Sequence, residues 1–279
     1  MSRRRGTSLT KTVTQSLRTI WAFLARDATI ALSYRLQFSL RVISILFMVS
    51  VLYFLSQLIG SNPALQSYGG YLPFAAIGLA VASYFQTGFS SFANAIRTEQ
   101  MMGTLEALLM TPTRIPRIVI ASSVWDFFWA TLTAIIYIVA ASLLYDIKLQ
   151  GNPVLAIVLL MLTTLVFASL GVLSASFIMV FKRGDPIGFL VGSVSTLLGG
   201  VVYPVSALPP WLQKISYLLP ITYGLDGLRG ILLKGESLSA VLPELAVLLG
   251  FASVGVPLSL FCFKRAVLRA QREGSLLQY

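Results

Sequence analysis

Few side chains of this 279-residue sequence could carry covalent or metal chemistry. It has no histidine, which is the commonest general base and metal ligand, and its single cysteine, Cys262, cannot form an internal disulfide. Asp126 is the only acidic residue well inside an apolar segment, where a structural pair or interfacial water is favoured over a proton relay. We therefore predict no catalytic residue and no metal site.

A methionine-rich segment between two apolar runs is the best candidate for contact with another protein. It reads RTEQMMGTLEALLMTP over residues 97–112. Its apolar residues recur at helical spacing and Pro112 ends the run, which predicts a short amphipathic helix at 97–110 with Glu99 and Glu106 on its polar edge. Such a helix either turns the chain at the membrane surface or docks into a partner, because methionine-rich faces adapt to a partner's shape.

Two apolar segments each carry a stripe of small or polar residues on one helical face, since residues three and four apart lie on the same side. The stripes are Ser83, Thr87, Ser90 and Asn94 in the first, and Gly188, Gly192, Ser195 and Gly199 in the second. Small residues let helices approach closely, and polar residues are costly against lipid. Packing within one subunit is one explanation, and a dimer interface or a substrate path between two copies is the other.

The segment 203–240 is too apolar for a loop and too broken for a membrane span. The proline pair at 209–210 begins a short helix, because proline is tolerated in the first turn. Pro220 separates it from a second short helix, in which Asp226 and Arg229 are spaced to pair. We expect this helical pair to dip into the outer leaflet of a membrane.

Six long apolar segments position these candidates, and they lie at 42–59, 72–94, 118–144, 153–181, 187–205 and 241–263. A helix needs about 20 apolar residues to cross a bilayer. Charged residues make up only 11% of the chain, against roughly 25% in soluble domains. We predict an all-α membrane protein with six transmembrane helices in a permease domain at 42–263. An amphipathic interfacial helix would lie in the cytoplasmic residues 1–41, and 264–279 would form a cytoplasmic tail.

Lys and Arg lie almost entirely in alternate gaps between these segments. Eight lie in 1–41, three in 95–117, two in 181–186 and four in 264–279. The other gaps hold only Lys148, Lys214, Arg229 and Lys234. This positive-inside pattern places both termini in the cytoplasm. The net charge of +11 therefore indicates contact with anionic membrane lipids and not with nucleic acid.

Two of these motifs resemble those of one transporter family. The run RTEQMMGTLEALLMTPTR is similar to the cytoplasmic coupling segment of ABC-2 type exporter permeases, and YPVSALPPWLQ followed by LPITYG resembles the end of the same family. The resemblance covers about residues 20–265. It implies a permease of the bacterial inner membrane that works as two permease copies, as a homodimer, with two ABC ATPase subunits.

The resemblance also implies roles for particular residues. Coupling to the ATPase would fall on Arg97, Glu99, Gly103, Thr104 and Glu106. External re-entrant helices would fall on 208–219 and 221–233, with an external gate at Tyr203, Pro204, Pro209, Pro210 and Trp211. The two stripes would border the substrate path.

The chain contains no glycine-rich phosphate loop, and the Gly-Lys pair of such loops occurs nowhere in it. We therefore expect it to be no enzyme, with ATP and Mg²⁺ bound by the partner ATPase. An amphipathic drug or lipid, or a lipid-linked polysaccharide, remains open as the substrate. The alternative is a secondary transporter that works without an ATPase, although a single Asp126 gives little support for ion coupling.

Overall fold

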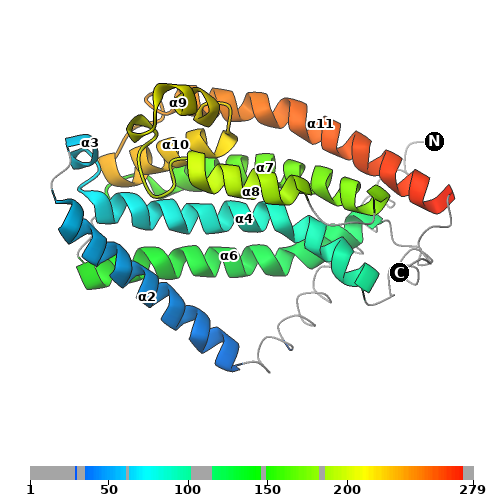
Figure 1. Cartoon of the computed structure of the whole chain (residues 1–279), viewed down its shortest axis with the longest axis horizontal. Helices are drawn as coiled ribbons and strands as arrows, with labels where there is room; N and C mark the ends of the chain where they lie inside the picture. Colours follow the sequence, from blue (N-terminus) through cyan, green and yellow to red (C-terminus); the bar gives the residue numbers. More distant parts are fainter. Residues whose placement is uncertain are drawn as a thin grey trace, which may run out of the picture.

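The computed structural model describes Thr29 and residues 35–60, 63–101, 115–145, 149–181 and 186–272, and this part of the chain contains helices and no strands. Figure 1 shows the helices as a layered bundle. They are α2 (Arg35–Ile59), α3 (Pro63–Gln66), α4 (Tyr71–Met101), α6 (Ile115–Tyr145), α7 (Pro153–Phe181), α8 (Pro186–Leu198), the 3-10 helix η1 (Val205–Ala207), α9 (Pro210–Ser216), α10 (Pro220–Lys234) and α11 (Leu242–Arg272). The all-α prediction is confirmed for these residues.

Five helices in the described ranges are long and apolar enough to cross a membrane. They are α2, α4, α6, α7 and α11, and each coincides with an apolar segment of the sequence. The interfacial helix expected in 1–41 lies almost entirely outside the described residues, as does most of the tail at 264–279 beyond Arg272.

The apolar segment at 187–205 differs from the expectation, because its helix α8 has only 13 residues and ends at Leu198. At 1.5 Å per residue it is ~20 Å long, against a hydrocarbon core of about 30 Å. The helix ends at Gly199 and Gly200, and Gly200 has φ +77°. A left-handed residue at this place ends a helix, and glycine adopts that conformation without strain.

The core lies where α4 packs between α6 and α7, and α11 covers the other side of α7. Phe85 and Phe89 of α4 are fully buried, and the Phe85 ring stacks on Phe167 of α7 with 5.1 Å between centroids. In contrast, α2 and α6 expose large apolar side chains such as Phe47 and Leu143. A surface of this kind matches lipid and would be costly in water.

The helix ends divide between two ends of the bundle. In Figure 1, α3, α9 and α10 lie toward one end, with the carboxyl end of α6. The carboxyl ends of α4, α7 and α11 point toward the opposite end. We call the first the outer end and the second the cytoplasmic end, following the positive-inside assignment.

Candidate translocation path and external helices

The predicted coupling segment begins as a continuation of a membrane span. Arg97 and Glu99 lie in the last turns of α4, which runs without a break to Met101. Gly103, Thr104 and Glu106 lie outside the described residues. The role of all five residues in coupling therefore stays a prediction.

The polar stripe of α4 lies on a face that the bundle leaves partly open. Ser83, Thr87 and Ser90 are half-buried and Asn94 is exposed. The Ser83 hydroxyl donates to the Ala80 carbonyl at 2.8 Å, and Thr87 donates to the Ser83 carbonyl at 3.1 Å. Because these bonds stay within α4, the two hydroxyls need no partner from another helix.

Two of the four residues of the second stripe, in contrast, are buried inside the subunit. Ser195 and Gly199 are buried, and a Cβ atom at Gly199 would overlap the Ile221 side chain of α10. Gly188 and Gly192 are half-buried, and a Cβ at Gly192 would lie 3.3 Å from the Oε1 atom of Gln86 on α4. The small residues of α8 and of the turn after it therefore allow close contact with α10 and α4.

Gln86 joins the two stripes, although the sequence analysis did not single it out. It lies three residues after Ser83 and four before Ser90, so it shares their side of α4. Its side chain is exposed and faces Gly192 of α8. A polar side chain in the middle of a span marks a candidate functional position.

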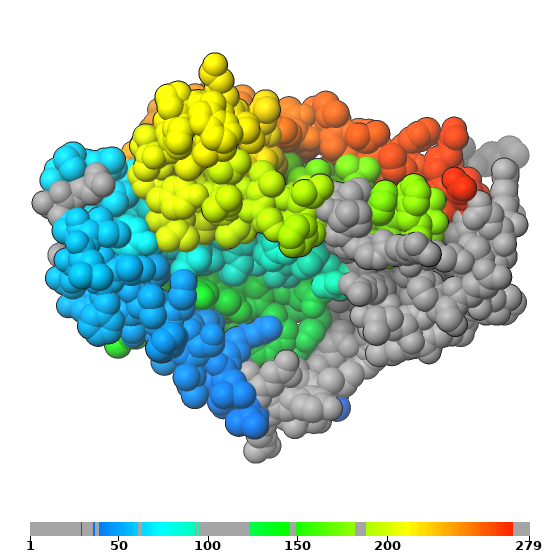
Figure 2. Space-filling view, in the orientation of Figure 1, coloured from blue at the N-terminus to red at the C-terminus, as the bar shows by residue number. Residues whose placement is uncertain are grey.

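Figure 2 shows a furrow over this region, in which the surface of α4 is visible between α8 on one side and α6 on the other. On the α6 side, the Thr131 hydroxyl lies 3.4 Å from the hydroxyl of Tyr84. The floor of the furrow thus comes from a largely buried central helix, and its polar side chains are accessible from outside the single chain.

The two external helices are present as α9 and α10, with proline at the start of each. Pro204 caps η1, Pro209 caps α9 and Pro210 is the first residue of α9. The Tyr203 hydroxyl donates to the Leu197 carbonyl of α8, which fixes the turn after that helix. Trp211 is 64% exposed and points away from the packed side of α9, so it is available to lipid or to another chain.

The helix α10 is held to the rest of the subunit by a buried arginine. Arg229 is 1% exposed, and its guanidinium donates hydrogen bonds to the carbonyls of Phe74 (3.1 Å), Gly200 (2.7 Å) and Val201 (2.6 Å). It also lies over the Phe74 ring, 3.5 Å from the centroid. One side chain therefore ties α10 to the outer end of α4 and to the turn that follows α8.

The guanidinium of Arg229 points to these three carbonyls, and it forms no ion pair with Asp226, another described residue, although their spacing predicted one. Burial lowers the pKa of Arg229 to about 10, so its side chain stays charged at neutral pH. Burial raises the pKa of Asp226; the nearby Arg229 opposes this rise, and Glu244 adds to it. The carboxyl group of Asp226 is therefore in an unfavourable place for a charge.

The place of Arg229 also explains a glycine on α4. A Cβ atom at Gly78 would overlap both the Arg229 guanidinium and the Val201 carbonyl. Only a residue without a side chain leaves room here for α10 and the turn after α8 to reach α4. The contact between these three elements therefore depends on Gly78 as well as on Arg229.

Comparison with known proteins assigns the chain. The family model described as ABC-2 type transporter matches residues 18–233, which include the coupling segment, both stripes and the external helices. The chain belongs to the ABC-2 transporter permease family. Together with its apolar helices, this makes it a multi-pass membrane permease of the ABC transporter type, a class whose members are transmembrane subunits without catalytic residues.

Three relatives illustrate the range of this ABC-2 family. The inner membrane transport permease YadH of Escherichia coli K12 is 29% identical over 64% of the chain and 70% of its own length. Nodulation protein J of Neorhizobium galegae is 31% identical over 72% of the chain and 76% of its own length. The probable multidrug ABC transporter permease YbhR of E. coli K12 is 28% identical over 62% of the chain, and the match covers 47% of YbhR.

Sequence reasoning about this ABC-2 permease overlooked Gln86 and misjudged Arg229. Both are polar side chains inside apolar helices, which is the signal that could have found them. Asp126, which carries the same signal, is half-buried in α6. Its burial fits the structural interpretation and the relay equally well.

Proposed function

We propose that this chain is the membrane permease of an ATP-driven exporter that moves an amphipathic molecule, a drug, a lipid or a lipid-linked polysaccharide, from the bacterial inner membrane outward. The observation that carries the proposal is the family match, because it runs from the coupling segment to the external helices. The relatives support it by name, since one is an inner membrane transport permease and another a probable multidrug ABC transporter permease.

The working assembly would contain two copies of this chain and two ABC ATPase subunits, which bind ATP and Mg²⁺. Both termini would lie in the cytoplasm, following the charge pattern. The sixth crossing would be made by α8 together with the turn after it, and α9 and α10 would lie in the outer leaflet as a re-entrant pair. Non-helical backbone at that depth is tolerated where protein covers it, and Val201 and Val205 are buried.

In this proposal the parts of the chain have separate tasks. The 97–110 segment receives the movement of the ATPase through Arg97, Glu99, Gly103, Thr104 and Glu106. The furrow over α4, with Ser83, Thr87, Ser90, Asn94 and Gln86, would face the second copy and line the path. The external helices, with Trp211 at their surface, would act as the lid.

The proposal is tested by purifying the chain in mild detergent together with its ATPase. We expect the ATPase to copurify and its activity to depend on the chain. Replacing both Glu99 and Glu106 by Ala should abolish that coupling while the chain still reaches the membrane. A double variant with unchanged, ATP-dependent transport would refute the coupling assignment. Transport by the chain alone without ATP would favour a secondary transporter and return attention to Asp126.

A further inference from the structure

Two acidic side chains lie close together at the outer end of the bundle, where α10 packs against α11. Asp226 lies in the middle of α10, and Glu244 lies in the first turn of α11. Gly227 brings the two helices together, since a Cβ atom at this position would lie 3.5 Å from the Cβ atom of Glu244. The neighbouring Asp226 is close enough for the charge of Glu244 to act on its carboxyl group.

This pair of acids has no direct partner in the part of the chain that the structure describes. Both residues are half-buried, and the Oε2 atom of Glu244 is fully buried without a hydrogen bond to any described residue. Neither residue forms an ion pair or a hydrogen bond with another described side chain. A buried carboxylate without a partner is costly, so the state of this pair depends on how many protons it carries.

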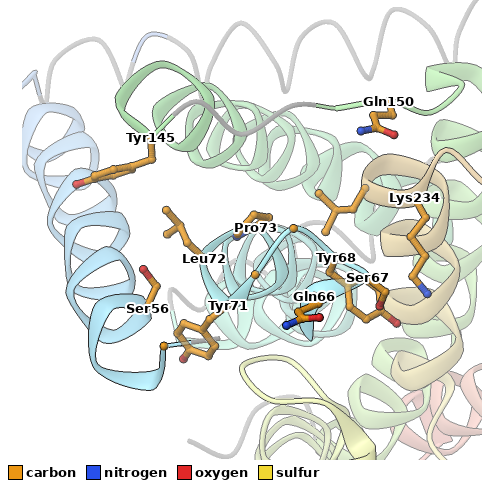
Figure 3. A pocket seen from close by; sticks show the side chains of 14 residues that line it. Ser56, Gln66, Ser67, Tyr68, Tyr71, Leu72, Pro73, Tyr145, Gln150 and Lys234 are labelled. Carbon is orange, nitrogen blue, oxygen red and sulfur yellow. The ribbon is translucent and has the colours of Figure 1, made fainter. Parts of the chain in front are cut away.

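The two cations of α10 form their contacts elsewhere. Arg229 donates its hydrogen bonds to three main-chain carbonyls. Lys234 lies 3.6 Å from the carboxylate of Glu236 and over the Tyr68 ring, and it lines a pocket to which neither acid contributes (Figure 3). Both cations act on Asp226 from a distance and favour its ionised form. Neither of them gives the pair a direct counter-charge.

The other elements around the pair supply no further cation. The helix α7, which packs against both α10 and α11, contains no titratable side chain, and only tyrosines can titrate in the outer half of α4. After α10, the carboxylate of Glu236 lies against Gly230, and Lys234 balances its charge. On α10 itself, Tyr223 donates its hydroxyl to the Tyr217 carbonyl, and a phenol is uncharged at neutral pH.

One proton would relieve the repulsion between the two carboxylates. Burial raises the pKa of Asp226, and Glu244 raises it further, because two carboxylates at one place are difficult to ionise together. Once one group is protonated, its O–H can donate to the other carboxylate, and hydrogen bonds to an ionised acceptor are among the strongest in proteins. Since both residues stay partly accessible at the outer end, the proton can come from the outside solution.

We propose that Asp226 and Glu244 form a pH-sensitive contact, in which the pair takes up one proton from outside and a carboxyl–carboxylate hydrogen bond then joins α10 to α11. Uptake reduces the pair from two negative charges to one, and no covalent bond other than the O–H bond forms. The contact is tight in acid and loosens as pH rises, when both groups are ionised and repel each other. Because α10 belongs to the proposed lid, the outside pH would set how firmly the lid is held. That consequence rests on the proposed function, whereas the contact itself does not.

The first experiment is an infrared titration of the full chain purified in detergent, because a protonated carboxyl group has a C=O band that a carboxylate lacks. The difference between the spectra of the wild type and Asp226→Asn isolates this acid from the other acidic residues. We expect its protonated band to appear as pH falls, with a midpoint above the ordinary value of 3.8. Glu244→Gln should shift that midpoint down. Glu236→Gln is the matched control and should shift it far less, because Glu236 is paired with Lys234.

Melting temperatures test the contact between the helices. At neutral pH, Asp226→Asn and Glu244→Gln should each raise the melting temperature, because either substitution removes the repulsion. The two effects should be less than additive in the double variant, since the repulsion can be removed only once. The advantage of each variant over the wild type should shrink as pH falls through the raised midpoint, where the wild type gains its own proton.

Three results would each overturn the proposal. The first is a midpoint for Asp226 at or below 3.8. The second is a midpoint that Glu244→Gln leaves unchanged, or that Glu236→Gln shifts just as far. The third is full additivity of the two substitutions in the double variant. Transport and ATPase activity play no part in these measurements, so the contact can fail while the export proposal stands.

Discussion

Replacing Arg229 by leucine should destabilise the permease more than any other single charge removal among the described residues. Leucine fills part of the same volume but offers no donor to the carbonyls of Phe74, Gly200 and Val201. Replacing a buried ion pair by apolar residues is often harmless, because both charges disappear together. Here the acceptors are main-chain groups that no substitution removes.

The expected loss follows from these contacts. The Phe74 carbonyl lies inside α4, where a backbone N–H of the helix can also donate to it, so loss of its hydrogen bond to Arg229 costs least. The carbonyls of Gly200 and Val201 lie after the end of α8, and a buried carbonyl without a partner costs about 1–3 kcal/mol. The lost stacking on the Phe74 ring adds up to about 2 kcal/mol in a desolvated site. Removing a buried charge also removes its desolvation cost, which offsets part of this loss. We therefore expect the free energy of unfolding to fall by about 3–5 kcal/mol in total, within the range for breaking a buried ionic contact.

The assay uses the single cysteine of the chain. Cys262 is half-buried in α11, so a maleimide dye that fluoresces on reaction reports unfolding from one position. At ~2–4 °C per kcal/mol for a chain of this size class, Arg229→Leu should lower the melting temperature in detergent by roughly 6–20 °C. Arg229→Lys should fall between this variant and the wild type, because an ammonium can still reach some of the carbonyls.

The matched control is Arg41→Leu. Arg41 also lies over an aromatic ring, with its guanidinium carbon 5.3 Å from the centre of the Trp129 ring, but it is exposed. A contact of this kind contributes about 0.5–1 kcal/mol, so the melting temperature should change little. If Arg229→Leu loses no more than about 1 kcal/mol of stability, the loss expected for the control, the buried hydrogen bonds do not hold α10. That result would refute the reasoning.

Three further predictions concern packing, the path and pH. Gly171→Ala should destabilise the α4–α7 contact, because its Cβ would overlap the Phe89 carbonyl. Gly88→Ala at the same contact should be tolerated, since the nearest neighbours of its Cβ would lie 3.6 Å away. Equal melting temperatures for the two variants would contradict this prediction. Gln86→Leu should reduce ATP-dependent transport into inside-out vesicles while leaving the melting temperature unchanged, and normal transport would remove Gln86 from the path. Asp226→Asn should stabilise the chain at neutral pH, because burial raises the pKa of Asp226 in the folded chain and the ionised form costs stability. The advantage of the variant should shrink as pH falls through the raised pKa and vanish below the ordinary value of 3.8. The melting temperatures of the variant and the wild type are therefore compared from neutral pH to below this value. A wild type that is more stable than the variant at neutral pH would contradict the prediction.

The membrane helices could be predicted from the sequence because each is a long run of apolar residues. The exception was α8, whose apolar composition continues past Leu198 through Gly199 and Gly200 to Val205. Hydropathy does not distinguish a helix from a buried turn, so the end of α8 could not be located from it. The glycine pair was the available signal, since it permits the left-handed backbone that ends the helix.

The site was less predictable because its contacts join distant parts of the chain. The partners of Arg229 lie 28 to 155 residues away, so local spacing suggested Asp226 instead. The α8 stripe was recognised by its spacing, but the spacing did not show that Gly199 packs on α10. The coupling residues Gly103, Thr104 and Glu106 lie outside the described residues, and their assignment rests on the family motif.

The continuity of α4 has a mechanical consequence. Its 31 residues form one helix from Tyr71 to Met101, which is ~46 Å at 1.5 Å per residue. A rod of this length that tilts by about 5° displaces one end by ~4 Å relative to the other. The same helix meets the coupling segment at its cytoplasmic end, forms the floor of the furrow at its middle and contacts Arg229 near its outer end. A small tilt imposed in the cytoplasm would therefore reach the outer end through one helix and pass to α10 through the contact between Arg229 and Phe74, so α4 would act as a lever.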